Sequence, residues 1–182
     1  MTYLKVLYYF LKYPDRFWLA MDLSRMSGIE LRSVYRAIGK LKEHHLICDH
    51  SKLYYLNAEI ISHLYGKKTE LRKKLENGST VEAFKIIYKK YDLELLLAKH
   101  FIADPHGEWT ASELSLLYGR PNSTVQSALE KMQILQIIKE DRTEHETNRT
   151  NPINYRLDAI LSANLSSKKN YLMERIQEME NV

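Results

Sequence analysis

The 182-residue sequence contains little cysteine or glycine, and each shortage excludes a class of protein. Its single cysteine, Cys48, excludes an intramolecular disulfide framework and a zinc site built from several cysteines, and it fits a reducing compartment. The 6 glycines form no phosphate-binding loop, and neither an HExxH zinc motif nor a serine nucleophile elbow occurs. We therefore expect no enzymatic activity, no cofactor and no metal.

The sequence also lacks a long uninterrupted hydrophobic run. Its most apolar stretch, residues 4–21, is broken by four charged residues and by Pro14, so it predicts neither a membrane span nor a signal peptide. We expect a cytoplasmic protein with no membrane partner. With 45% hydrophobic and 27% charged residues, the chain can bury an ordinary core, and its formal net charge is +4.

An internal repeat organises the chain. Residues 4–47 align without gaps onto residues 95–138 at a shift of 91, and the likeness resumes at a shift of 101, where Tyr54 meets Tyr155. We therefore predict two domains, residues 1–79 and residues 80–182. The identical pairs of the first block include Phe10/Phe101, Trp18/Trp109, Leu23/Leu114, Ser24/Ser115, Gly28/Gly119, Val34/Val125, Ala37/Ala128 and Lys40/Lys131.

Each copy has the same order of local signals. An apolar helix is predicted over Tyr3–Tyr13 in the first copy and over about residues 81–103 in the second, followed by a turn and by a buried tryptophan. A second helix ends near Gly28 or its counterpart, and in the second copy Thr110 and Glu113 have the spacing of a capping box.

A third helix and a hairpin follow in each copy. In the first copy the helix turns Leu31, Val34, Ile38 and Leu41 inward. The hairpin is expected to have its polar tip at residues 49–52. In the second copy a loop from Glu140 to Pro152 joins its strands, and closing helices are predicted over Asn57–Glu76 and Asp158–Glu180. The expected fold is mainly α with small β-hairpin wings, arranged as two tandem winged-helix domains.

A family resemblance supports this fold. Residues 28–47, GIELRSVYRAIGKLKEHHLI, resemble the core of bacterial and archaeal winged-helix regulators of the MarR and PadR kind, and residues 119–138 resemble it too. The resemblance implies that the helix after the turn enters the major groove of DNA and that the wing touches backbone phosphate.

The outward face of the third helix supplies the candidate DNA contacts. Guanidinium groups of arginine bind guanine edges or phosphate, and hydroxyl groups bind phosphate. Lysines extend the positive surface, and one of them lies at the expected hairpin tip. The first copy is also the more basic one: its residues 1–79 carry a charge of +6, from 14 cations and 8 acids, against −2 for the remainder, from 13 cations and 15 acids. The candidates in the first copy are Arg32, Ser33, Tyr35, Arg36, Lys40 and Lys52.

In the second copy the corresponding helix carries mostly uncharged side chains. Gln126 could read adenine, whereas Glu130 would repel phosphate. The candidate DNA contacts of this copy are Ser123, Gln126, Ser127, Arg142 and Arg149.

A metal site is the competing interpretation of one segment. His44, His45, Cys48 and His50 are ligand types that zinc or copper accepts. The cysteine is predicted beside the first hairpin strand and two of the histidines at the end of the preceding helix, so convergence on one ion would need an unusual turn. We therefore expect structural or solvated histidines.

Together these features predict sequence-specific binding of double-stranded DNA, mainly through the first domain, and a role in transcription regulation. A homodimer through the terminal helices is a further prediction. Two alternatives stay open: a tandem winged-helix scaffold whose second domain binds a protein partner, and a plasmid or phage replication initiator that grips DNA with both domains.

Overall fold

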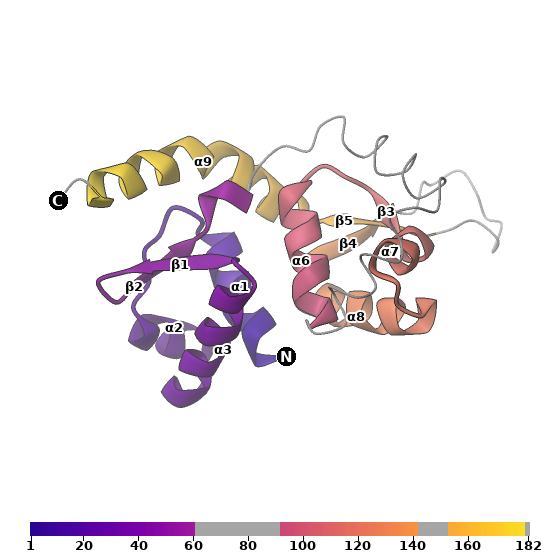
Figure 1. Ribbon diagram of the computed structural model, residues 1–182, viewed down its shortest axis with the longest axis horizontal. Coiled ribbons are helices and arrows are strands. Elements are labelled where there is room, and N and C mark those ends of the chain that lie inside the picture. Colours follow the sequence, from indigo (N-terminus) through magenta and orange to yellow (C-terminus); the bar gives the residue numbers. More distant parts are fainter. Residues whose placement is uncertain (61–91, 142–152, 181–182) are drawn as a thin grey trace. The chain divides into compact units, whose positions relative to one another are not determined.

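A computed structural model describes residues 1–60, 92–141 and 153–180 of the chain. Two compact units divide it: one combines residues 1–62 with residues 159–182, and the other spans residues 63–158 (Figure 1). The described residues are mainly helical and include two small antiparallel sheets. This confirms the expected mainly α class with small β-hairpins.

Three helices and a hairpin form the first part of unit 1. Helix α1 contacts both α2 and α3, and its apolar face, with Leu7 and Phe10 at its centre, is fully buried. Burial of this face is the main stabilising contribution to a small helical unit. The elements are α1 (Thr2–Lys12), α2 (Ala20–Ser27), α3 (Leu31–Glu43), β1 (Ile47–His50), β2 (Leu53–Leu56) and a 3-10 turn, η1 (Ala58–Ile60).

The hairpin of unit 1 is longer than expected. Strand β1 continues through His50, which pairs with Leu53, so the tip shrinks from the expected residues 49–52 to Ser51 and Lys52. Both tip residues have positive φ, 48° and 67°, the combination that a type I′ turn requires. The right-handed twist of the two strands favours this turn, which explains why the ladder extends further than polarity alone predicts.

Unit 2 repeats this order. Helices α6, α7 and α8 and strand β4 begin and end 91 residues after α1, α2, α3 and β1, and β5 begins and ends 101 residues after β2. The element boundaries therefore follow the two shifts found in the sequence. The elements are α6 (Leu93–Ala103), β3 (Trp109–Thr110), α7 (Ala111–Tyr118), α8 (Asn122–Ile134), β4 (Ile138–Asp141) and β5 (Asn154–Leu157).

The turn before the third helix is built alike in both units. Gly28 and Gly119 end α2 and α7 with φ of 66° and 60°, the left-handed conformation that glycine adopts without steric cost. The hydroxyls of Ser24 and Ser115 each donate a hydrogen bond, of 2.6 and 2.5 Å, to the carbonyl oxygen five residues further on. These contacts set the angle at which α3 and α8 leave the turn.

The tryptophans and the capping box lie where the sequence predicts. Trp18 and Trp109 are 0% and 1% exposed, and the backbone of each pairs with the second hairpin strand. At the start of α7, the Thr110 hydroxyl accepts a hydrogen bond from the Glu113 backbone, and the Glu113 carboxylate accepts one from the Thr110 backbone. These expectations are confirmed.

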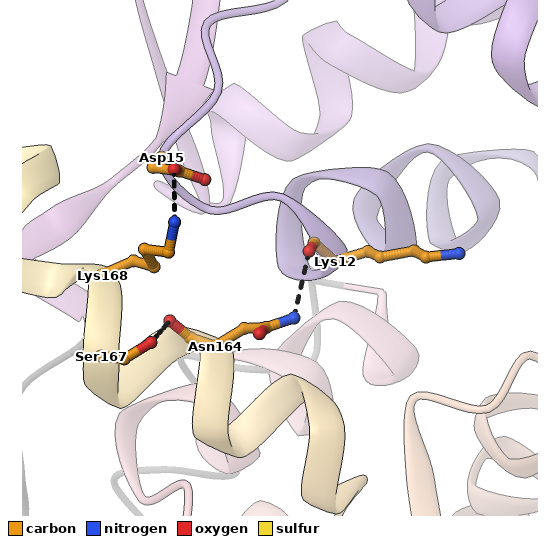
Figure 2. A network of polar contacts seen from close by, with 5 residues as sticks. All are labelled: Lys12, Asp15, Asn164, Ser167 and Lys168. Carbon is orange, nitrogen blue, oxygen red and sulfur yellow. Dashed lines mark hydrogen bonds and ion pairs between the residues drawn. The ribbon is translucent and has the colours of Figure 1, made fainter.

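The C-terminal helix α9 (Ala159–Glu180) belongs to unit 1, whereas the sequence assigned it to the second domain, residues 80–182. Asn164 donates a 3.1 Å hydrogen bond to the Lys12 carbonyl oxygen, and the Lys168 ammonium lies 2.8 Å from an Asp15 carboxylate oxygen (Figure 2). The helix contacts α1 and η1, so it closes the unit that begins the chain.

Apolar burial gives the physical reason for this assignment. Leu161, Leu165 and Leu172 lie on one stripe of α9 and are at most 2% exposed. The sequence assigned closing helices by order along the chain, which carries no information about the unit that receives them. Of the closing helix predicted over Asn57–Glu76, all residues after Ile60 lie outside the described residues.

Candidate nucleic-acid interface

Helix α3 separates apolar and polar residues between two faces. Val34, Ala37, Ile38 and Leu41 are buried against the unit, as the 3.6-residue period predicts. Leu31, which the sequence placed on the same face, is 36% exposed, because it stands in the first turn, beyond the edge of the core.

Two arginines stand on the outward face one helical turn apart. Arg32 and Arg36 are exposed, with the exposed ring of Tyr35 beside them and the half-buried Ser33 at the edge of the face. Across the part of the chain that the structure describes, neither guanidinium contacts a carboxylate. Two positive charges separated by i and i+4 reinforce each other's field and are kept together at a cost in stability.

The two lysines of α3 make different contacts. The Lys40 ammonium lies 4.8 Å from the ring centroid of Tyr3, which is a cation–π attraction. The Lys42 ammonium instead lies 2.5 Å from an Asp49 carboxylate oxygen, and this hydrogen bond raises the pKa of Lys42 above its ordinary value of 10.5. The Asp49 carboxylate therefore offsets the positive charge of Lys42.

A glycine occupies the same outward face. Gly39 is exposed within α3, and a Cβ built there would meet nothing within 4 Å. Glycine in a helix interior costs about 0.5–1 kcal/mol relative to alanine, and no neighbouring side chain needs the space. The missing side chain leaves the helix backbone open to close approach from outside.

Lys52 lies apart from α3, at the exposed tip of the β1–β2 hairpin. Its φ of 67° is a conformation that a residue with a side chain adopts at a cost of roughly 1 kcal/mol or more. A cation is thus held at a position where glycine is the residue of lower energy.

Helix α8 presents a different surface at the equivalent positions. Ser123, Gln126 and Ser127 are exposed, as expected, and Glu130 is exposed where the first unit has Gly39. The other two candidates of this copy, at positions 142 and 149, lie outside the described residues.

The cations described in unit 2 are largely paired with acids. Burial raises the pKa of Glu94, but the hydrogen bond from the Lys131 ammonium, a backbone hydrogen bond and the positive charge of Lys131 together lower it more, so the net shift is downward. These pairs reduce the positive field of the unit. They are Lys131–Glu94 at 2.8 Å, Lys139–Asp158 at 2.7 Å and Arg156–Asp141 at 3.2 Å.

The histidine segment does not converge on a common point. His44 is buried at the end of α3, His45 turns the chain with φ of 56°, Cys48 is half-buried in β1, and His50 is exposed near the tip. No group of three or more metal-ligating side chains occurs within residues 1–60, 92–141 and 153–180.

Sequence reasoning missed three residues that distinguish the surroundings of α3 from those of α8: Gly39, Tyr3 with its ring, and Glu94 with its carboxylate. A signal for all of them existed in the repeat, because Tyr3 aligns with Glu94 and Gly39 with Glu130, and Lys40 and Lys131 are identical.

Comparison of the chain with protein-family models, with curated proteins and with solved structures finds no match. In the described ranges, no helix combines the length and apolar character that a membrane crossing requires.

Proposed function

We propose that the chain is a transcription regulator that binds double-stranded DNA through two tandem winged helices, mainly through α3. Among the described residues of each unit, three successive helices, with a tight turn between the second and third, are followed by a hairpin, which is the order of a winged helix-turn-helix. The sequence resemblance to MarR- and PadR-like regulators supports the same assignment.

One observation carries the proposal: the outward face of α3 holds two arginines that no described acid balances. Arg32 and Arg36 are exposed without a carboxylate partner among the described residues. Salt bridges are easily formed on a surface, as unit 2 shows, so a helix that leaves two arginines together without acids favours a polyanionic partner. Arginine also forms two parallel hydrogen bonds to guanine in the major groove.

Gly39 adds support from a different direction. An exposed helix glycine without an internal packing reason lowers stability, and such departures from local rules concentrate at functional sites. Close approach of a phosphate backbone to the α3 backbone gives this glycine a use.

Fluorescence anisotropy of the intact protein on a generic duplex across a salt series tests the proposal. The logarithm of affinity falls linearly with the logarithm of salt concentration, by about 0.9 for each phosphate contact. We expect a steep slope that flattens by about 1–2 in Arg32→Ala/Arg36→Ala, with a loss of affinity of at least tenfold.

Two double variants serve as controls. Lys5→Ala/Lys99→Ala removes two charges from α1 and α6 and should leave the slope within experimental error. Ser123→Ala/Ser127→Ala alters the equivalent face of α8 and should cost less affinity than the arginine pair. A folded protein that does not bind the duplex even at low salt, or equal losses in the arginine and lysine pairs, would contradict binding through α3.

A protein-interaction role for unit 2 is the second candidate, favoured by two exposed apolar side chains. Leu116 in α7 and Ile134 at the end of α8 are 58% and 73% exposed. Scattered apolar residues are normal on surfaces, so these two support the role only if the anisotropy experiment gives no binding. In that outcome unit 2 becomes the surface on which a protein partner is sought.

The predicted homodimer through terminal helices is kept as a proposal. Helices α1 and α9 contact each other in the same chain, so a dimer would use their remaining faces, where Ile160 and Tyr171 are 67% and 49% exposed. Size-exclusion chromatography with mass detection decides this, and a strict monomer at micromolar concentration removes the dimer.

A further inference from the structure

We infer that α3 and α8 read different bases, so that one chain recognises a bipartite DNA site without twofold symmetry. One part of the site contains guanine and thymine and lies under α3, and the other contains adenine and lies under α8. The inference rests on the proposed function, because it assigns the base preference of a surface proposed to bind DNA.

The two helices share one scaffold. Both have 13 residues, and their buried positions coincide after the shift of 91: Val34 with Val125 and Leu41 with Met132 mark the two ends of the buried stripe. The same glycine-containing turn precedes each helix. Equivalent outward positions are therefore presented with the same rotation about the helix axis, and differences in recognition come from side-chain chemistry alone.

The outward side chains of α3 match guanine and thymine. Arg32 and Arg36 are exposed, and a guanidinium donates two hydrogen bonds to the O6 and N7 acceptors of guanine. Leu31 and Tyr35, 36% and 52% exposed, stand one turn apart on the same face. Apolar groups in the major groove are placed favourably against the methyl group of thymine, which no other base carries.

The outward side chains of α8 match adenine. Asn122 and Gln126 replace Leu31 and Tyr35 at the same positions and are both exposed, one turn apart. A side-chain amide donates to N7 and accepts from the N6 amino group of adenine. The exposed hydroxyls of Ser123 and Ser127 replace the two arginines, so the charge that favours guanine is absent here.

Glu130 strengthens the difference. An exposed carboxylate on the outward face repels phosphate and the acceptor edge of guanine, and it accepts a hydrogen bond from the N4 amino group of cytosine. Its counterpart Gly39 imposes no such restriction. Unit 2 thus contributes base discrimination with little electrostatic affinity, whereas unit 1 contributes most of the affinity.

Selection of binding sites from a random duplex library by the intact protein tests the inference. We expect the selected sites to contain a guanine- and thymine-containing element and a separate adenine-containing element, in one fixed order. Selection with Gln126→Ala should retain the first element and lose the preference for adenine. Arg32→Ala/Arg36→Ala should lose the guanine preference.

A measurement on the selected duplex gives the size of the effect. Replacing the preferred adenine by guanine should weaken binding of the unaltered protein by about fivefold to a hundredfold, the range for one bidentate contact. The same base change should leave the affinity of Gln126→Ala nearly constant. Gln177→Ala, which removes an exposed amide from α9, is the matched control and should discriminate as the unaltered protein does.

The outcomes separate this inference from the proposed function. Selected sites that contain a guanine element alone, or a palindrome of two guanine-containing arms, would overturn the adenine reading by α8 while leaving DNA binding through α3 intact. Failure to bind any duplex, seen already in the salt series, would overturn both. Equal adenine discrimination by Gln126→Ala and the unaltered protein would also overturn the inference.

Discussion

The two units carry side chains of different charge at equivalent positions. In unit 2 the pair formed by α6 and α8 is an ion pair, Glu94 with Lys131, whereas in unit 1 the equivalent pair is Tyr3 with Lys40. Both pairs join the first helix of the unit to the third, and the pair in unit 2 brings a carboxylate to the lysine where the pair in unit 1 brings an aromatic ring. Equivalent contacts in the two units thus differ in the charge of one partner.

The tryptophans differ in a related way. In unit 2 the Trp109 indole donates a 3.3 Å hydrogen bond to the buried carboxylate of Asp104. In unit 1 the position of that aspartate is taken by Tyr13, and the buried indole N–H of Trp18 has no hydrogen-bond partner among the described residues. Here the ring is packed by aromatic neighbours, and the Arg16 guanidinium lies 4.1 Å from its centroid. The Trp109 indole thus has a buried acceptor in addition to its ring neighbour His100, whereas Trp18 is surrounded by rings and a guanidinium.

The largest effect we predict tests the polar core of unit 2. In Gly107→Ala the new Cβ would fall 1.8 Å from the Asp104 carboxylate oxygen, so that carboxylate must move and release the Trp109 indole. A buried donor and acceptor left unpaired cost about 2–3 kcal/mol in stability. Thermal unfolding with hydrogen exchange resolved by unit should show the loss in unit 2.

The equivalent position in unit 1 is the control for this change. Arg16→Ala removes only a cation–ring contact, worth about 0.5–1 kcal/mol. If the two substitutions destabilise their units equally, the distinction between a polar core and an aromatic core is wrong.

The tryptophans themselves give the next largest effect. Trp109→Phe and Trp18→Phe remove similar ring volume, but only the first breaks a hydrogen bond and leaves the Asp104 carboxylate buried without its donor. We expect Trp109→Phe to destabilise by about 1–2 kcal/mol more than Trp18→Phe. Chemical denaturation of the two variants measures the difference, and a larger loss for Trp18→Phe would reverse the comparison.

Introducing the carboxylate of unit 2 at the equivalent position of unit 1 gives a smaller effect. Tyr3→Glu places a carboxylate opposite Lys40, as Glu94 stands opposite Lys131. We expect duplex affinity to fall by about fivefold and the salt slope to lose about one phosphate contact. Anisotropy measures both, and Tyr3→Gln is the uncharged control. Unchanged affinity in Tyr3→Glu would show that Lys40 lies outside the interface.

The smallest predicted effect is a pH dependence confined to unit 2. The pKa of Glu94 is lowered in the folded chain, so its pair with Lys131 stabilises at pH values above about 4.5 and is lost as the pH falls through the folded pKa. Because the pair is partly exposed, it contributes no more than about 1 kcal/mol. Denaturation at pH 7 and pH 3 should show a smaller loss of stability in Glu94→Gln than in the unaltered protein. An equal loss in both would assign the acid sensitivity to other groups.

The sequence predicts local structure well in this chain because the repeat tests each pattern twice. Gly28 and Gly119, the buried tryptophans and the capping box at Thr110 all follow from short-range chemistry, which acts within a few residues. The unit against which α9 packs was not predicted from the sequence. Its stripe of leucines would fit any apolar groove, and only tertiary packing selects one of them. The charge balance of Lys40 and Lys42 was missed for a similar reason: their partners, Tyr3 and Asp49, are defined by packing.

The placement of α9 also determines when unit 1 can be completed. Its polar ties to the first unit span 152 and 153 residues of sequence, from Asn164 to the Lys12 carbonyl oxygen and from Lys168 to Asp15. During synthesis, chains emerge from the N-terminus, and contacts between distant residues form late because loop closure costs entropy. The part of unit 1 that carries Arg32 and Arg36 therefore emerges first but acquires its closing helix last, after all of unit 2 has been made.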